Sequence, residues 1–311
     1  MRTSAGYLFM GIYKKPPFEW AQQLESLIQK GLVIDEPAHS CFKLVSYQRF
    51  SGYLAAFYLP ERNSFRDDTT FERAWELYEF DRELRLLVSD AIERIEVAFR
   101  TALSETMSME YSSHWFLQAE LFKNPERYKL FIKKAKEASR DPHDAELRRY
   151  YARYSQPDYP PSWLLFEKLS FGVCTNLFRN LKHVKDRRAV SKWFGYHPTV
   201  LASWIESIRY TRNLCAHHAR LWNRWFVSAP ILTLTAHNGS PNPSMFLPNS
   251  QIENVKTTFK AQAAVMYCLL EALVPGNEWQ RRLFMLFEKY PQTEFDKMGF
   301  DKDWRHDNFW Q

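Results

Sequence analysis

Residues 70–103 read TFERAWELYEFDRELRLLVSDAIERIEVAFRTAL, and this stretch decides the fold. Its apolar residues recur every three or four positions over many turns, as expected of one buried stripe on an α-helix. Charged residues fill most of the other positions, which predicts solvent-facing sides. The spacing therefore predicts a long amphipathic helix over these residues. The stripe consists of Leu77, Phe80, Leu84, Leu87, Val88, Ala91, Ile92, Ile95, Phe99, Ala102 and Leu103.

The chain on both sides of this stretch is also predicted to be helical. Pro16 and Pro17 precede an apolar-periodic segment that ends before Gly31, which gives a helix with a start and a stop signal. A short strand or hairpin is an alternative within 226–235, and 237–250 is predicted to be a loop. The sequence shows no β-α-β alternation, so we predict an all-α protein. Further helices are expected at about 112–121, 124–139, 143–154, 162–181, 186–195, 197–222, 251–274 and 277–289.

The composition indicates a helical protein with a moderately basic surface. Glycine is scarce, at nine residues, and the formal net charge of +6 favours a polyanionic partner. The most apolar stretch, 261–274, is too short to cross a membrane, and the N-terminus lacks the features of a signal peptide. We therefore expect a cytoplasmic protein. The cysteines are far apart, which argues against a disulfide framework or a zinc ribbon; they are Cys41, Cys174, Cys215 and Cys268.

The residues best suited to chemistry lie within 205–225, which read IESIRYTRNLCAHHARLWNRW. Arginine offers a bidentate fork for phosphate oxygens, and histidine can move a proton near neutral pH. RNA supplies its own nucleophile, the 2′-hydroxyl, so a base, an acid and positive charge suffice for cleavage without a metal. If the helix continues through this segment, Arg212 lies about 100° to one side of a shared polar face. That face carries Asn213, His217, Arg220 and Arg224.

The same residues also permit a purely structural interpretation. Arg212 can pair with carboxylates inside a helical bundle, and His217 can be an ordinary surface residue. Cys215, His217 and His218 form at most part of a metal site, because no fourth ligand stands at zinc-like spacing. We predict neither a metal nor a cofactor.

Two other groups of charged residues accompany this segment. Glu96 and Arg100 stand four residues apart on the long helix, so we expect an intrahelical ion pair, with a contact to Arg212 as the alternative. Residues 179–192 carry a local charge of +5, which fits either an RNA backbone or a solvated helix end. The basic residues are Arg179, Lys182, Lys185, Arg187, Arg188 and Lys192, and the acidic residue is Asp186.

Arg212-Asn213-x-x-x-His217 resembles the R-x(4–6)-H signature of the HEPN superfamily. The wider chain resembles the Abi-like abortive-infection family of that superfamily (AbiD/AbiF type). The matching segments stand in one order over residues 13–224, which is more specific than any of them alone. They are Tyr13-x-Lys15-Pro16-Pro17, Leu27-x-x-x-Gly31-Leu32-x-Ile34, Tyr47-x-Arg49-x-Ser51-Gly52-Tyr53, Tyr78-x-Phe80-Asp81-Arg82-x-Leu84-Arg85, Ile95-Glu96, Ser170-Phe171-Gly172 and Arg212-Asn213-x-x-x-His217-x-x-Arg220-x-x-Asn223-Arg224.

The resemblance implies a HEPN-like helical bundle that has additional N- and C-terminal helices and acts on RNA in phage defence. Arg212 would stabilise the scissile phosphate, His217 would transfer a proton, and Asn213 would orient Arg212 or the substrate. His218 is the alternative histidine. The residues expected to contact RNA are His218, Arg220 and Arg224, together with Arg179, Lys182, Lys185, Arg187 and Arg188.

Because related sites use two copies of the motif and this chain has one, we expect a homodimer. Its association would depend on the apolar flanks of the motif, Trp204, Ile208, Trp222 and Trp225. We expect an N-terminal helical segment at 1–65 packed on the core, the HEPN-like core at 66–228, and a loop with C-terminal helices at 229–311.

The predicted function is that of a metal-independent endoribonuclease of an abortive-infection or toxin system. The alternative is a non-catalytic RNA-binding protein that holds a structured small non-coding RNA. A third interpretation is a structural interaction module without RNA.

Overall fold

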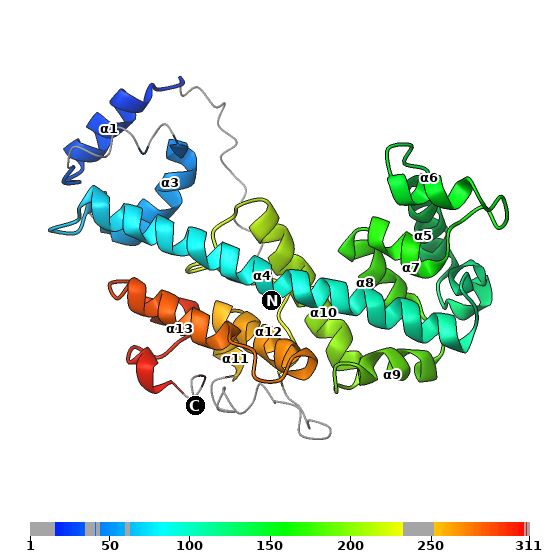
Figure 1. The fold of residues 1–311 in the computed structure, drawn as a ribbon. Helices are drawn as coiled ribbons and strands as arrows, with labels where there is room; N and C mark the ends of the chain where they lie inside the picture. The colour runs from blue at the N-terminus through cyan, green and yellow to red at the C-terminus, as the bar shows by residue number, and fades with distance from the viewer. Residues whose placement is uncertain are drawn as a thin grey trace, which may run out of the picture. The chain divides into compact units, whose positions relative to one another are not determined.

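The computed structural model describes residues 16–34, 41, 44–59, 63–232, 252–307 and 309. Within these ranges almost all regular structure is helical (Figure 1). Apart from two isolated β-bridges, the exception is a short antiparallel pair of strands, β1 (Tyr58–Leu59) and β2 (Ser64–Phe65). The prediction of an all-α fold is confirmed.

The chain divides into two compact units, Met1–Glu79 and Phe80–Gln311, and the division falls within helix α4 (Phe71–Glu110). The first unit contains α1 (Trp20–Gln29), α3 (Tyr47–Leu54), the 3-10 turn η1 (Ala55–Phe57) and the start of α4. Burial of apolar side chains stabilises this unit. Its core includes Leu27, Leu32, Val45, Phe50, Leu54, Phe65, Phe71 and Ala74.

Helix α1 ends at the stop signal that the sequence contains. Gly31 has a φ of +92°, a conformation that glycine adopts without steric cost. Its N–H donates to the carbonyl of Ile28 at 2.8 Å, and the N–H of Leu32 donates to the carbonyl of Leu27 at 3.1 Å. These two bonds form a Schellman motif, the usual end of a helix that stops at glycine. The predicted helix before Gly31 is therefore confirmed.

Helix α4 confirms the predicted long helix and extends it to Glu110. Every residue of the apolar stripe is buried, and the last seven residues of α4 continue it with the buried Met107. In the second unit the ring of Phe99 on α4 packs edge-on against Phe171 and Phe178, with centroids 5.9 and 5.5 Å away. Such pairs add to the burial energy of each ring. They attach helix α8 (Phe171–Asn180) to α4.

The second unit is a helical bundle. Its helix α10 (Pro198–Ala216) contains the predicted site residues Arg212 and Asn213. Helix α10 packs against α8, α9 and α12, and α5 packs against α7 and α8. The remaining elements are η2 (Trp115–Leu117), η3 (Ala119–Leu121), α5 (Pro125–Ala138), α6 (Ala145–Tyr151), α7 (Ser162–Lys168), α9 (Val184–Lys192), α11 (Ile252–Val255), α12 (Phe259–Leu273), α13 (Trp279–Lys289), η5 (Phe295–Met298) and η6 (Trp304–His306).

Several predicted elements differ from the structure. The helix expected at 251–274 is divided into α11 and α12. The helix expected at 162–181 is divided into α7 and α8, because Leu169 is extended and its carbonyl accepts a hydrogen bond from Arg100 at 3.0 Å. The helix expected at 112–121 consists of the two 3-10 turns η2 and η3. Residues 226–232 form no strand, and the rest of the hairpin and the loop at 237–250 lie outside the described residues.

Candidate active site at the end of helix α10

The segment from Arg212 to His217 lies at the C-terminal end of α10. Arg212 and Asn213 belong to its last turn, and His217 is the residue that caps it, with a φ of −90°. The N–H of His217 donates to the carbonyl of Asn213 at 3.0 Å. His217 is exposed and Asn213 is half-buried. Because they stand four residues apart, Asn213 and His217 lie one turn apart on the same side of α10, and Arg212 is displaced by about 100°.

The helix predicted at 197–222 ends six residues early, and His218 is the reason. His218 has a φ of +53°, a conformation uncommon for residues other than glycine. Its N–H donates to the carbonyl of Cys215 at 2.9 Å, and the N–H of Ala219 donates to the carbonyl of Leu214 at 2.8 Å. This is the Schellman motif that also ends α1 at Gly31, here with histidine in the left-handed position.

The early end of α10 changes the position of the two arginines that follow it. The prediction that Arg220 and Arg224 continue the face of His217 is wrong, because the chain turns away from the helix axis at His218. The Arg220 guanidinium instead lies over the ring of Trp222, at 6.0 Å from its centroid. Arg224 donates from Nε to the carbonyl of Arg220. Both arginines are partly exposed.

Arg212 is anchored at one atom and exposed beyond it. Its Nε lies 3.8 Å from Oε2 of Glu96 on α4, and 47% of its side chain is exposed against 12% for Glu96. The other carboxylate oxygen of Glu96 accepts from Arg100, whose guanidinium also donates to the carbonyl of Leu169. The expected intrahelical pair and its alternative, a contact to Arg212, therefore both occur. Within the described part of the chain the Arg212 side chain makes no other ion pair or hydrogen bond, so its terminal nitrogens can bind a ligand.

A buried aspartate fixes the chain that leaves α10. Asp81 on α4 is fully buried, and its Oδ1 accepts from the backbone N–H groups of Leu221 at 3.0 Å and Trp222 at 2.7 Å. Its Oδ2 accepts from the buried Arg85. The indole N–H of Trp222 donates to the carbonyl of Glu294 at 3.2 Å. Our reasoning from sequence missed this role of Asp81, although a charged pair inside an apolar stripe is a visible signal.

The cysteine of this segment differs from the histidines in its burial. Cys215 is buried, and burial raises the pKa of its thiol to about 12. A neutral thiol is a poor metal ligand, because cysteine binds metals as the thiolate. His217 and His218 are exposed. Among the described residues no cluster of three or more histidine, cysteine or carboxylate side chains is arranged to hold a metal ion.

A comparison with protein families matches residues 41–223 to the family described as Abi-like protein. The match covers more than half of the chain. The chain belongs to the Abi-like protein family. This Abi-like protein is related by its family to abortive infection, a form of phage defence. No curated protein and no solved structure is significantly similar to the chain.

The matched region of the Abi-like protein includes the whole of α4 and α10. It therefore contains the Asp81–Arg85 pair, the Glu96–Arg212 contact and His217. In the described part of this Abi-like chain, no helix has the length and apolar character needed to cross a membrane.

Three of the four apolar residues that flank the motif are buried within the Abi-like protein. Trp204 and the neighbouring Ile208 are at most 1% exposed, as is Trp222. They cannot supply an interface between chains, so that expectation is wrong for these residues. Trp225 is 71% exposed, and Val97, next to Glu96 on α4, is 43% exposed.

The basic side chains of residues 179–192 lie in different environments. Arg179 and Arg187 line a hollow at the N-terminal end of α10. His217 lies at the other end of α10 and is not among the residues that line this hollow. Lys185 is paired with Glu110 at 2.6 Å, whereas Lys182 and Arg188 are exposed. Along α10, Thr199 in the hollow and Asn213 are separated by about 21 Å, at 1.5 Å per residue. The structure thus separates the predicted RNA-contacting residues into two groups.

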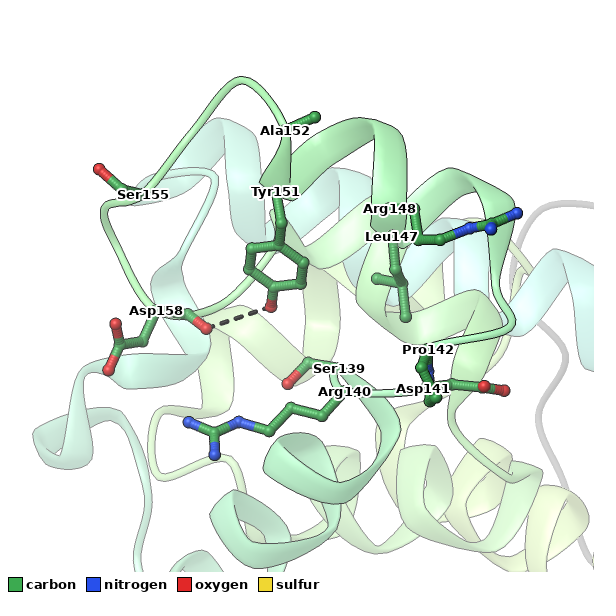
Figure 2. A pocket seen from close by; sticks show the side chains of 10 residues that line it. All are labelled: Ser139, Arg140, Asp141, Pro142, Leu147, Arg148, Tyr151, Ala152, Ser155 and Asp158. Carbon is green, nitrogen blue, oxygen red and sulfur yellow. Dashed lines mark hydrogen bonds between the residues drawn. The ribbon is translucent and has the colours of Figure 1, made fainter.

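A second hollow of the Abi-like protein, of about 560 Å³, lies between the end of α5, helix α6 and the loop before Asp158 (Figure 2). Figure 2 shows Leu147 and Tyr151 pointing into it, and the Tyr151 hydroxyl donates to the carbonyl of Asp158 at 3.2 Å. Two arginines and two aspartates line it, so its formal charges balance. No predicted site residue is among its lining residues: Ser139, Arg140, Asp141, Pro142, Leu147, Arg148, Tyr151, Ala152, Ser155 and Asp158.

Proposed function

We propose that this Abi-like protein is a metal-independent endoribonuclease of HEPN type that acts in phage defence or as a toxin. The observation that carries the proposal is the arrangement of Arg212 and His217 at the exposed end of α10. Arg212 pairs at Nε with the buried Glu96 at 3.8 Å, and almost half of the arginine side chain is exposed to solvent. Its remaining N–H donors can bind the two oxygens of a phosphate.

The proposed reaction needs a base, an acid and a positive charge. The base removes the proton of the 2′-hydroxyl, and the 2′-oxygen forms a bond to the adjacent phosphorus. The bond to the 5′-oxygen breaks, and the acid donates a proton to that oxygen. The products are a 2′,3′-cyclic phosphate and a 5′-hydroxyl. Arg212 would stabilise the charge of the phosphorane, His217 would transfer a proton, and Asn213 would orient Arg212 or the substrate.

Because each chain supplies one Arg212 and one His217, we propose that the active unit is a homodimer with a shared cleft. Two copies bring two histidines to one phosphate, so that one can act as the base and the other as the acid. In a two-fold interface, residues near the axis meet their own copies. Trp225 and Val97 are exposed apolar side chains near this segment that remain available for association.

Mixing wild-type and Arg212→Ala chains is expected to reduce cleavage more than dilution does. If both arginines are needed, only wild-type homodimers cut. With the variant in ninefold excess, activity should fall to about 1% of the undiluted value, against about 10% for independent chains. Cleavage assays after refolding or subunit exchange measure this ratio. Activity in strict proportion to the wild-type fraction contradicts the shared cleft.

Incubating the purified protein with total RNA in excess EDTA tests the proposed function. We expect fragments on a denaturing gel, at the same rate as in Mg²⁺, because arginine and histidine supply the charge and the proton transfer. A native gel of the same samples measures binding. Strict dependence on Mg²⁺ contradicts the mechanism. Binding with intact RNA favours the alternative of a non-catalytic protein that holds a structured small RNA, and no binding favours an interaction module.

A further inference from the structure

Three positively charged side chains from three elements surround a hollow of about 480 Å³ at the start of α10. Lys123 comes from the loop before α5, Arg179 from the last turn of α8 and Arg187 from α9. Lys123 lay outside the predicted site residues. The hollow is completed by Pro198, Thr199, Ala202, Ser203, Glu206, Ser228 and Ala229.

Backbone pairing between two distant segments brings these side chains together. The N–H of Lys123 donates to the carbonyl of Asn180 at 3.0 Å, and the N–H of Lys182 donates to the carbonyl of Leu121 at 2.8 Å. The buried Asn180 side chain accepts from the N–H of Asn124 at 3.0 Å and donates to its carbonyl at 3.1 Å. The satisfied amide of Asn180 fixes this register. Lys123 is thereby held beside the end of α8.

The Arg187 side chain is held by hydrogen bonds to nearby backbone carbonyls. Its guanidinium donates to the carbonyl of Leu181 and, at 3.4 Å, to that of Lys182. An arginine carries five N–H donors, so two such bonds leave donors for a ligand. The side chain is therefore positioned in advance of binding, which reduces the entropy that binding costs.

Among the described residues that line the hollow, positive side chains outnumber negative ones. Glu206 is the acidic side chain that lines it, 3.5 Å from Arg179, and it is also paired with Arg209. Burial and then the neighbouring cations Arg187, Arg127 and Arg179 lower the pKa of Lys123. An anion in the hollow would relieve this repulsion. The larger hollow of Figure 2 offers no such excess of charge.

We propose that this hollow binds a backbone phosphate of the same RNA strand that is cut at Arg212. Thr199, Ala202, Glu206, Arg209 and Asn213 follow one another at three- and four-residue spacing, so they share one face of α10. A strand along this face would run about 21 Å from the hollow to Asn213. The site would thus select RNA of several nucleotides over a mononucleotide. The choice of RNA as the ligand rests on the proposed function.

Side chains rather than backbone amides would hold the phosphate. Pro198 has no N–H, and the N–H of Thr199 donates to the ring of His197 at 3.3 Å. The positive end of the α10 dipole still favours an anion at this end. Lys123 and Arg179 are therefore the residues to replace. Arg187 is unsuitable because its loss would also remove its bonds to Leu181 and Lys182.

Fluorescence anisotropy with a single-stranded RNA oligonucleotide tests the proposal on the full chain. We expect Lys123→Ala and Arg179→Ala each to weaken binding about fivefold and to lower the salt slope by about 0.7. Lys136→Ala is the matched control, because it removes one positive charge from an exposed position on α5 outside the hollow. The control should change binding less than about twofold. Thermal unfolding of all variants checks that they fold.

The outcomes separate this inference from the proposed cleavage. Selective loss of binding in the hollow variants supports the inference, even if the wild type leaves the RNA intact. Equal binding by all variants overturns it, even if the wild type cuts RNA. Inorganic phosphate or a mononucleotide that binds the wild type as tightly as the oligonucleotide, and loses affinity in the same variants, overturns the assignment to an RNA strand.

Discussion

Replacing His217 by alanine is expected to lower the rate of RNA cleavage by about 10²- to 10⁴-fold and to leave the fold intact. The imidazole is exposed. The backbone N–H of His217 donates to the carbonyl of Asn213, and alanine retains this bond. The loss should therefore reflect proton transfer rather than unfolding. Single-turnover cleavage together with thermal unfolding measures the two effects separately.

His218→Gly is the matched control for this variant. His218 occupies the left-handed position that ends α10, and glycine adopts this conformation without strain. We expect the variant to retain most of the cleavage and to gain up to about 1 kcal/mol of stability. Full activity in His217→Ala with loss in His218→Gly would assign proton transfer to His218. Loss in neither variant would remove the catalytic proposal.

Replacing Asp81 by alanine is expected to lower the free energy of unfolding by about 3–5 kcal/mol. The change leaves the charge of the buried Arg85 without this carboxylate, and it removes the acceptor of the Leu221 and Trp222 N–H groups. A buried donor without an acceptor adds to the cost. Urea unfolding followed by circular dichroism measures the effect.

Asp90→Ala provides the comparison on the same helix. The Asp90 side chain is 32% exposed and pairs with Arg282 at 2.6 Å and Arg94 at 3.6 Å. Solvent-exposed pairs of this kind contribute at most about 1 kcal/mol. A similar loss for both variants, or a loss below about 1 kcal/mol for Asp81→Ala, would show that Asp81 does not anchor the segment after α10.

The parts of the fold that local sequence determines were predicted well. The apolar stripe of α4 and the glycine after α1 are signals that act within a few residues, and both helices form as expected. The end of α10 was missed because histidine stands where the stop signal is usually glycine. Leu221 and Trp222 continue the apolar spacing, so the pattern predicts helix as far as residue 222. In the structure the backbone N–H groups of both residues instead donate to Asp81, which lies 140 positions before Leu221.

The candidate site was predictable to the extent that it is local. Arg212, Asn213 and His217 stand in one short segment, and its resemblance to a family predicts them as site residues. The structure places all three at one helix end. Lys123 could not be predicted from the sequence, because backbone pairing with residues 180–182 places it beside Arg179. Apolar spacing likewise does not distinguish a core residue such as Trp204 from an interface residue.

End-group analysis of one defined RNA oligonucleotide, incubated in EDTA with wild type or with His217→Ala, tests the central claim most directly. We predict that the wild type produces fragments with a 2′,3′-cyclic phosphate at one end and a 5′-hydroxyl at the other, and that the variant leaves the oligonucleotide intact. Fragments with 5′-phosphate ends, equal fragmentation by the variant, or an oligonucleotide that the wild type binds but never cuts would contradict the account.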